Sequence, residues 1–244
     1  MSDLEARPNG GTKSSGKRGK SNSLPRRKAY LLTISSSKGG SCKSTATRNL
    51  AVAAVHGGLS VATVDLDAQQ TLTIWNNRRP EAAPTISHYS FALRTANDEI
   101  KALVDDGGFD LVIVDTPPGI ENHATELRML VRASDYVLLP TQQQSSDLDS
   151  VIEWARTVKR EGARFSFLLS RTARNRRSFQ EAKQRLVEVG PLAPIDIRDL
   201  ASVDVSNKMG VGNIEIRRDA VGDDFLAAWR FLAREIGLSL PRED

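Results

Sequence analysis

The stretch SSSKGGSCKST, residues 35–45, decides how the rest of the chain is read. It comes close to the phosphate-binding loop GxxxxGK[ST], but Ser37 and Cys42 stand where that pattern has glycine. An apolar, strand-like run at 29–35 precedes it and a helix-like run at 43–56 follows, and helix starts attract phosphate through free backbone N–H groups. We therefore expect Lys43 to reach the outer phosphates of a nucleotide and Ser44 to bind Mg²⁺.

Beyond this loop, strand-like and helix-like stretches alternate. Strands are predicted at 60–67, 109–115, 135–140 and 164–170, with a sixth at 193–197, and helices at 97–106, 121–132, 146–160 and 178–188. Strands that are apolar on both faces and separated by helices predict an α/β fold, a mostly parallel twisted sheet with helices on both faces. A final helix at 223–237 carries one apolar stripe and a mixed-charge polar face, which favours packing on the sheet over lying on a membrane.

Three aspartates follow these strands. Asp65 and Asp67 end the second strand and Asp115 ends the third, so their carboxylates should meet at the carboxyl edge of the sheet, where open α/β sheets bind ligands. One aspartate there can hold hydrated Mg²⁺ while another orients or deprotonates the attacking water. Any one of them alone is more typical of a solvated turn, but together with Lys43 and Ser44 they favour a site.

Charge divides the 244 residues unevenly. Residues 1–28 hold eight Lys or Arg against two acidic residues, and they contain few large apolar side chains. We expect 1–28 to be a disordered basic tail and 29–244 to be one domain. The tail could hold DNA phosphates or could simply aid solubility, and its sequence leaves both readings open.

Composition also limits compartment and cofactor. No apolar window is long enough to cross a membrane and the first residues lack a secretion signal, so a cytoplasmic protein with no membrane partner is expected. Cys42 is the single cysteine, which rules out an internal disulfide and a CxxC metal site.

The segments KGGSCKST, VDLDAQQT and FDLVIVDTPPG, with SDYVLLPTQ further on, resemble the motifs of the ParA/MinD family of ATPases with a deviant phosphate loop, in the same order and approximate spacing. The resemblance extends from about Tyr30 to the last helix and is greatest to the small partition and positioning ATPases. It implies a phosphate-loop NTPase fold, the cofactors ATP and Mg²⁺, weak ATPase activity and an ATP-dependent homodimer.

Position by position, the resemblance assigns further roles. Lys38 corresponds to a signature lysine that reaches the partner's phosphates, and so joins Asp67, which positions the hydrolytic water beside the metal, as a catalytic residue. Asp115 would hold Mg²⁺ through water, with Ser44 and Asp67 beside it. The nucleotide-binding residues implied are Lys38, Gly39, Gly40, Ser41, Cys42, Lys43, Ser44 and Thr45.

Two positions depart from the family pattern. Cys42 replaces a glycine that lets backbone approach phosphate, and Ala68 replaces a common proline with little expected effect. If φ is negative at Cys42 its small side chain should be tolerated, so we expect weakened but not abolished nucleotide binding. A thiol beside Lys43 at a helix start should also have a lowered pKa.

The resemblance further implies non-specific binding of double-stranded DNA by the ATP dimer, on the nucleoid, with hydrolysis stimulated by a ParB-like or cargo-bound adaptor. Arg198, Arg217 and Arg218 rank first as DNA contacts, ahead of arginines at 171–177. Such a switch would segregate or position a plasmid, a chromosome origin or a protein assembly.

The alternative is a non-hydrolysing pseudo-ATPase, disabled by Cys42, that acts as a DNA-binding or scaffold protein. Among metabolic relatives, the single cysteine excludes nitrogenase-iron-type reductases and disfavours the tail-anchor and arsenite ATPases. A division-site regulator of the MinD type would need a basic membrane-binding terminus, and the mixed charge of the final helix disfavours that reading.

Overall fold

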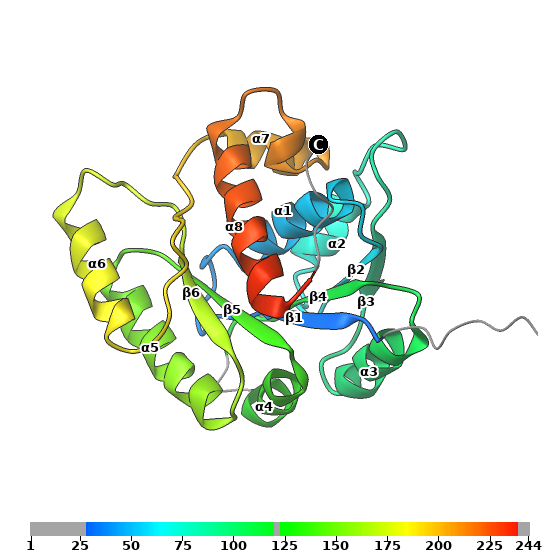
Figure 1. Cartoon of the computed structure of the whole chain (residues 1–244), viewed down its shortest axis with the longest axis horizontal. Coiled ribbons are helices and arrows are strands. Elements are labelled where there is room, and N and C mark those ends of the chain that lie inside the picture. The colour runs from blue at the N-terminus through cyan, green and yellow to red at the C-terminus, as the bar shows by residue number, and fades with distance from the viewer. Residues whose placement is uncertain (1–27, 120–122, 239–244) are drawn as a thin grey trace, which may run out of the picture.

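A computed structural model describes residues 28–119 and 123–238, so nearly all of the expected basic tail lies outside the described residues. Within them, six parallel strands form one sheet in the order β3-β2-β4-β1-β5-β6 (Figure 1). The strands are β1 (Tyr30–Ile34), β2 (Val61–Asp65), β3 (Ser87–Ser90), β4 (Leu111–Asp115), β5 (Tyr136–Thr141) and β6 (Phe165–Leu169). This is the predicted α/β architecture.

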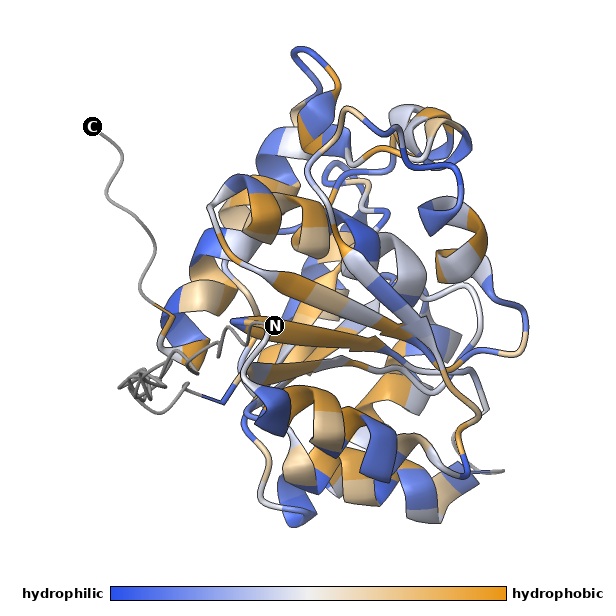
Figure 2. Cartoon of the chain, turned by 90° about the vertical axis from the view of Figure 1, so that its right-hand side faces the viewer, coloured by the Kyte–Doolittle hydropathy of each residue, from blue (hydrophilic) through white to orange (hydrophobic). Residues whose placement is uncertain are grey.

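Helices cover both faces of the sheet. On one face lie α1 (Lys43–His56), α2 (Thr71–Asn76), α7 (Ser202–Met209) and α8 (Ala220–Ile236), with a short 3₁₀ turn, η2 (Asn213–Glu215), beside α8. On the other lie α3 (Ala96–Asp106), α4 (Ala124–Ala133) and α5 (Ser145–Arg160), and α6 (Arg177–Val187) packs against α5. Hydrophobic residues, orange in Figure 2, concentrate on the strands and on parts of the helices, and clusters of buried apolar side chains fill both sides of the sheet.

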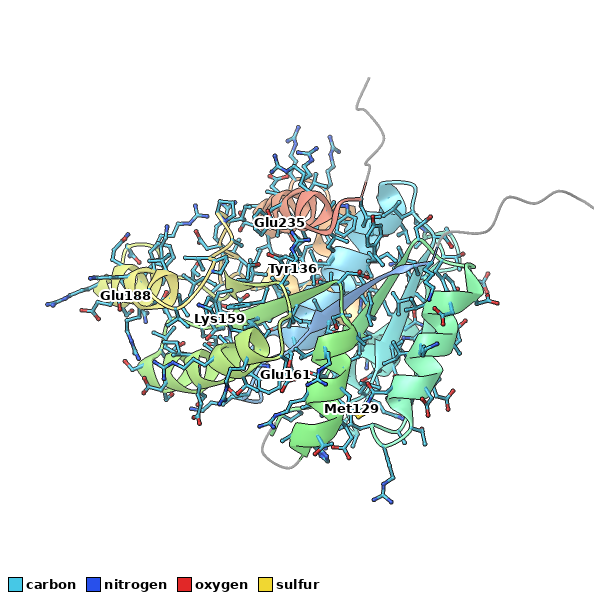
Figure 3. All side chains as sticks on the ribbon, turned by 60° about the horizontal axis from the view of Figure 1, so that its bottom comes forward. Met129, Tyr136, Lys159, Glu161, Glu188 and Glu235 are labelled. Carbon is cyan, nitrogen blue, oxygen red and sulfur yellow. The ribbon has the colours of Figure 1, made fainter. Side chains whose placement is uncertain are left out.

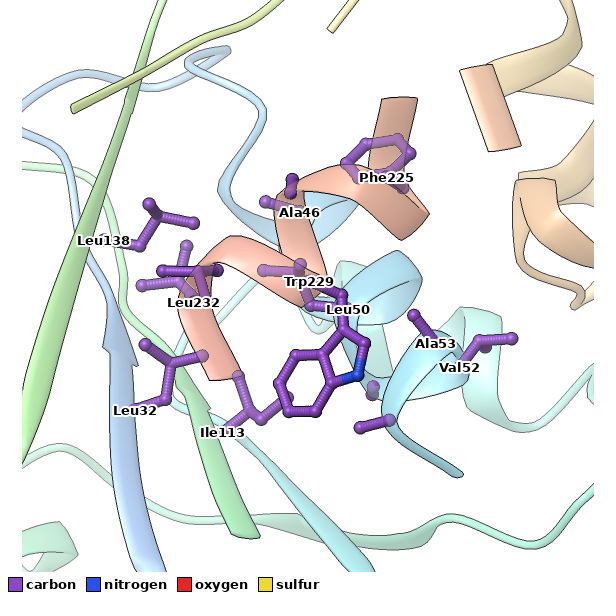
Figure 4. Packing of buried hydrophobic residues seen from close by; sticks show 14 of the residues in the cluster. Leu32, Ala46, Leu50, Val52, Ala53, Ile113, Leu138, Phe225, Trp229 and Leu232 are labelled. Atoms are coloured by element: carbon purple, nitrogen blue, oxygen red, sulfur yellow. The ribbon is translucent and has the colours of Figure 1, made fainter. Parts of the chain in front are cut away.

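The core on the α1 side is organised around Trp229 of α8. Its indole packs with Leu32 of β1, Leu50 of α1 and Ile113 of β4, and all four side chains are almost fully buried (Figure 4). Burial of a side chain of this size contributes about 2–3 kcal/mol through the hydrophobic effect alone. The apolar stripe of the last helix is therefore core, as its periodicity predicts, and no helix of the described residues is long and apolar enough to cross a membrane.

The outer surfaces of the opposite layer are charged. Glu161, which follows α5, accepts a hydrogen bond from Arg132 of α4 and so ties these two helices together at the protein surface (Figure 3). An exposed pair of this kind contributes little stability, which leaves the buried apolar contacts as the main support of the layer.

One predicted strand is wrong and another was missed. Residues 193–197 do not form a regular strand; they run beside β6 with isolated bridges at Leu192 and Arg198. Pro194 has no N–H to donate, and the Asp196 side chain bonds Thr172, so the ladder is interrupted there. The strand missed by the sequence analysis is β3. It lies at the edge of the sheet, and its short polar sequence SHYS gives no apolar signal.

Candidate nucleotide-binding site

The loop of residues 35–42 leaves β1 at the carboxyl edge of the sheet and leads directly into α1. It borders a cavity of about 570 Å³, which residues 39–45, Asp67, Thr71 and Pro118 line on one side. The segment 197–201 together with Ser170 and Arg171 lines the other. The structure thus brings the phosphate-like loop and the aspartate Asp67 to one cavity.

Lys43, the first residue of α1, lies beneath this loop. Its side chain is buried, with Nζ donating to the carbonyl of Lys38 at 3.1 Å, and burial lowers its pKa while the carboxylates of Asp115 and Asp67 oppose that change. The first turn of α1 carries no acidic residue, so its free N–H groups and the Lys43 ammonium place positive charge at the loop, with Asp115 and Asp67 as the nearby carboxylates. Such a site attracts phosphate.

Asp115 is the unusual carboxylate of this cavity edge. It is 1% exposed, and within the described part of the chain neither carboxylate oxygen has a hydrogen-bond partner. Burial raises its pKa to about 7, against the opposing effects of the nearby Ser44 hydroxyl and the Lys43 charge. Burial of a carboxylate without hydrogen bonds is costly, and a cation that binds it would offset that cost.

The donor set here suits Mg²⁺ bound together with phosphate. No group of three or more His, Cys, Asp or Glu side chains in the described residues could hold a metal by itself. Mg²⁺ does not need one, because it keeps several waters and takes phosphate oxygens with one or two protein oxygens. Asp115 and Ser44 offer such oxygens beside the cavity, so these residues fit the ion.

Asp65, in contrast, is engaged elsewhere. It is fully buried, and its Oδ1 accepts the Asp67 N–H at 3.0 Å while its Oδ2 accepts both the N–H and the hydroxyl of Thr73 at 2.9 Å. The three carboxylates therefore differ: Asp65 is taken up by its own chain, Asp67 lines the cavity, and Asp115 is buried near Lys43 and Ser44. Asp65 instead shapes the turn that carries Asp67.

Cys42 contradicts two expectations. Its φ is 68° and its ψ 22°, so the residue adopts the left-handed conformation that favours glycine, and the condition of a negative φ is not met. Burial raises the pKa of its thiol to about 11, because desolvation outweighs the neighbouring arginines and Lys43. The expected reactive thiolate is therefore wrong for the ligand-free chain.

Lys38 does not line the cavity. Its Nζ donates to the Ser146 carbonyl at 2.8 Å and lies 3.8 Å from Asp147 Oδ1, so the first turn of α5 holds it within the same chain. Gln142, after β5, braces the neighbouring loop residue by donating to the Gly40 carbonyl at 2.7 Å. Its position directly after a strand end was the only signal for this contact in the sequence.

The three arginines ranked first for DNA differ in their surroundings. Arg198 makes a paired hydrogen bond to both carboxylate oxygens of Asp224 and also donates to the Ala220 carbonyl, which anchors the 197–201 segment to α8. Arg217 and Arg218 are exposed, and no ion pair among the described residues involves them. Their charge is therefore available to a partner, whereas that of Arg198 is largely balanced.

Comparison with known proteins gives one consistent result. Residues 32–200 match the model of the CobQ/CobB/MinD/ParA nucleotide binding domain. The "Maintenance of carboxysome distribution protein A" of Gloeobacter kilaueensis is 34% identical over 174 residues, which cover 70% of this chain and 76% of that protein.

Solved structures agree in fold. The septum site-determining protein MinD of Pyrococcus horikoshii, complexed with Mg-ADP, superposes with a TM-score of 0.72 at 18% identity, covering 86% of this chain and 98% of that one. A putative plasmid partition protein of Borrelia burgdorferi, bound to AMPPNP, gives a TM-score of 0.64 at 16% identity, with coverage of 85% and 100%.

Proposed function

The chain belongs to the CobQ/CobB/MinD/ParA family of nucleotide-binding domains, and we propose that it is an ATP-dependent dimerising switch that positions a cargo over nucleoid DNA. The observation that carries this proposal is the Asp115 carboxylate, which is buried without a hydrogen-bond partner among the described residues and lies near Lys43 and Ser44, two residues that line a cavity large enough for a nucleotide. Two structural relatives that bind Mg-ADP and AMPPNP support ATP and Mg²⁺ as the cofactors.

Each residue of the cavity has a role in this account. The α1 N-terminus and Lys43 would bind the phosphates, and Ser44 and Asp115 would hold Mg²⁺, the latter through water. The chemistry supplied by the bound ion would be neutralisation of the charge that develops on the phosphates. Asp67, at the cavity wall, orients the attacking water. Its backbone is held in place by the hydrogen bond from its N–H to the Asp65 carboxylate.

Dimerisation would change the partners of Lys38. In the single chain it is bound to Ser146 and Asp147, and both contacts are partly exposed, so they are weak enough to exchange. Reaching the phosphates of a second copy replaces them with a charge-assisted bond to an anion. A catalytic charge supplied in trans would couple hydrolysis to the dimer, as an arginine finger does.

The DNA-binding surface of this proposal centres on Arg217 and Arg218. They lie just before α8, are exposed, and have no carboxylate partner among the described residues. Two copies of the chain would present four such side chains, and phosphate contacts of this type give sequence-independent, salt-dependent binding. A cargo-bound adaptor of the ParB kind would stimulate hydrolysis and release the DNA.

The DNA step is tested by a charge reversal. Arg217→Glu combined with Arg218→Glu should remove Mg-ATP-dependent DNA retention, while Mg-ADP affinity in calorimetry stays within about twofold, because neither residue lines the cavity. The matched control is Arg156→Glu with Lys159→Glu, two exposed positions on α5. Equal DNA retention by both double variants at low salt would remove Arg217 and Arg218 from the site.

A second candidate, the pseudo-ATPase, is favoured by one observation, the left-handed Cys42 in the phosphate loop. A side chain there costs about 1 kcal/mol or more and stands where backbone must approach phosphate. Steady-state phosphate release with and without DNA separates the two candidates. Turnover that Asp67→Ala abolishes supports the switch, whereas Mg-ATP binding without turnover supports the scaffold.

A further inference from the structure

His88 lies on the edge strand β3, outside the cavity, yet its imidazole connects to the site through hydrogen bonds. Nδ1 lies 3.0 Å from the Thr63 hydroxyl of β2, its partner in the parallel ladder, and Nε2 lies 2.9 Å from the Thr73 hydroxyl of α2. Thr73 in turn donates to Asp65 at 2.9 Å. Three elements, β2, β3 and α2, thus meet in one chain of hydrogen bonds.

The direction of these bonds is settled by counting protons. The Thr73 hydroxyl has one proton, which it donates to the Asp65 carboxylate, so it accepts from His88 Nε2–H. Nδ1 then carries no proton and accepts from the hydroxyl of the fully buried Thr63. The neutral imidazole with its proton on Nε2 satisfies every group in the chain.

This chain ends at the turn that carries Asp67. Asp65 receives the N–H groups of Asp67 and Thr73 together with the Thr73 hydroxyl, and these three bonds hold the segment between β2 and the first turn of α2. Asp67 and Thr71, both within that segment, line the cavity. The orientation of one cavity wall therefore depends on Asp65. The Thr73 hydroxyl links Asp65 to the imidazole of His88 by two hydrogen bonds.

We propose that His88 is a positioning residue, which orders the Thr73 hydroxyl toward Asp65 and thereby fixes the turn that presents Asp67 to the nucleotide. The consequence for turnover rests on the proposed function. The consequence for the turn itself does not, because it follows from hydrogen bonds of the ligand-free chain.

Protonation breaks the chain in a defined place. A second ring N–H on Nδ1 would itself donate to the Thr63 hydroxyl oxygen, so the proton of that buried hydroxyl would lose Nδ1 as its acceptor. Asp65 is the only titratable side chain of β2, and α2 has none, so the Asp65 carboxylate is the one charge facing the ring from these elements. Burial lowers the pKa of His88, and Asp65 opposes that change.

The pH dependence follows from that direction. Because the pKa of His88 is lower in the folded chain than the value of about 6.5 in an unfolded one, the network contributes its full stability above about pH 6.5, and that contribution is lost as the pH falls from there through the lower pKa of the folded chain. The turn should therefore loosen in mild acid.

Amide hydrogen exchange of the nucleotide-free protein, followed by NMR, tests the positioning claim. His88→Leu should speed exchange at the Asp67 and Thr73 amides by about tenfold, the effect of one lost buried hydrogen bond, and leave amides of β4 unchanged. His88→Gln keeps a donor and an acceptor and should restore slow exchange. Ser87→Ala, one residue earlier on the opposite face of β3, is the control.

Two outcomes decide the proposal. Between pH 7.5 and 5.5, opening of these two amides, corrected for intrinsic exchange, should increase in the wild type and stay constant in His88→Gln, which cannot be protonated. Unchanged exchange in His88→Leu, or an equal response to pH in the wild type and His88→Gln, would overturn the role of His88.

Turnover adds a second, separable readout. His88→Leu should lower kcat about tenfold while Mg-ATP affinity stays within about threefold, and His88→Gln should recover kcat at pH 7.5. Unaltered kcat in His88→Leu despite faster exchange would contradict the link to Asp67. A wild type without turnover would instead count against the proposed ATPase, and the amide exchange would then decide the positioning claim by itself.

Discussion

Asp65 and Asp115 face each other in the ladder between β2 and β4, at the same edge of the sheet, and both are buried. The Asp65 carboxylate has three donors from its own chain, whereas the Asp115 carboxylate has no hydrogen-bond partner among the described residues. Equivalent places in the sheet thus hold one carboxylate whose interactions are complete and one whose interactions are not. The carboxylate at the β2 end therefore supports the local structure of the site, and the proposed Mg²⁺ contact falls to the carboxylate at the β4 end.

Removal of the Asp65 carboxylate should have the largest effect on stability. Asp65→Ala leaves two backbone N–H groups and the Thr73 hydroxyl without their acceptor, so the free energy of unfolding should fall by about 3–5 kcal/mol. Urea denaturation measures this value. Asp67→Ala, at a partly exposed position, is the control and should cost under about 1 kcal/mol. Equal losses in the two variants would contradict a supporting role for Asp65.

Asp115→Asn should raise the free energy of unfolding, whereas Asp65→Ala lowers it. The pKa of Asp115 is about 7, above the value near 4 in an unfolded chain, so its contribution is favourable below about pH 4 and is lost as the pH rises to about 7. Replacing the carboxylate removes that loss. The nucleotide-free variant should gain about 2–4 kcal/mol at pH 8 and nothing at pH 4.

Denaturation curves at both pH values check this difference. A variant less stable than the wild type at pH 8 would show that the Asp115 carboxylate has partners in the folded chain, and the contrast with Asp65 would fail.

The smallest expected effect concerns the loop beside Asp115. Cys42→Gly places glycine, which tolerates this conformation, at φ 68°. The relief of backbone strain should exceed the entropy that glycine adds to the unfolded chain, so the folded protein should be stabilised by about 0.5–1 kcal/mol. Cys42→Ala removes the thiol but keeps Cβ, so it should gain nothing. Thermal melts of the two variants side by side measure the difference, and equal melting temperatures would refute strain at this position.

Regular elements with an apolar signal could be predicted from the sequence. The runs that became β1, β2, β4, β5 and β6 are buried on both faces and therefore read as continuous apolar strands. The edge strand β3 is only partly buried and spells SHYS, so it had no such pattern, and α2 and α7 are short helices that depend on tertiary contacts. The stretch at 193–197 is mostly apolar because it lies beside β6, although its proline interrupts the hydrogen-bond ladder with that strand.

The site was predictable where residues lie close in sequence. Lys43 and Ser44 follow the loop directly, and Asp115 ends a clear strand, so their meeting follows from the parallel sheet. The conformation of Cys42 and the burial of its thiol depend on how the loop closes against Arg171 and the rest of the cavity wall. The partners of Asp65 depend on a turn and an edge strand with no sequence signature.

The most direct test of the account is calorimetric titration of ADP into the wild type and Asp115→Asn, each with Mg²⁺ and with a chelator. The account predicts that Mg²⁺ strengthens ADP binding at least about tenfold in the wild type and has little effect in the variant, since the carboxylate that holds the ion is gone. Absence of ADP binding to the wild type, or an equal gain from Mg²⁺ in both proteins, would contradict it.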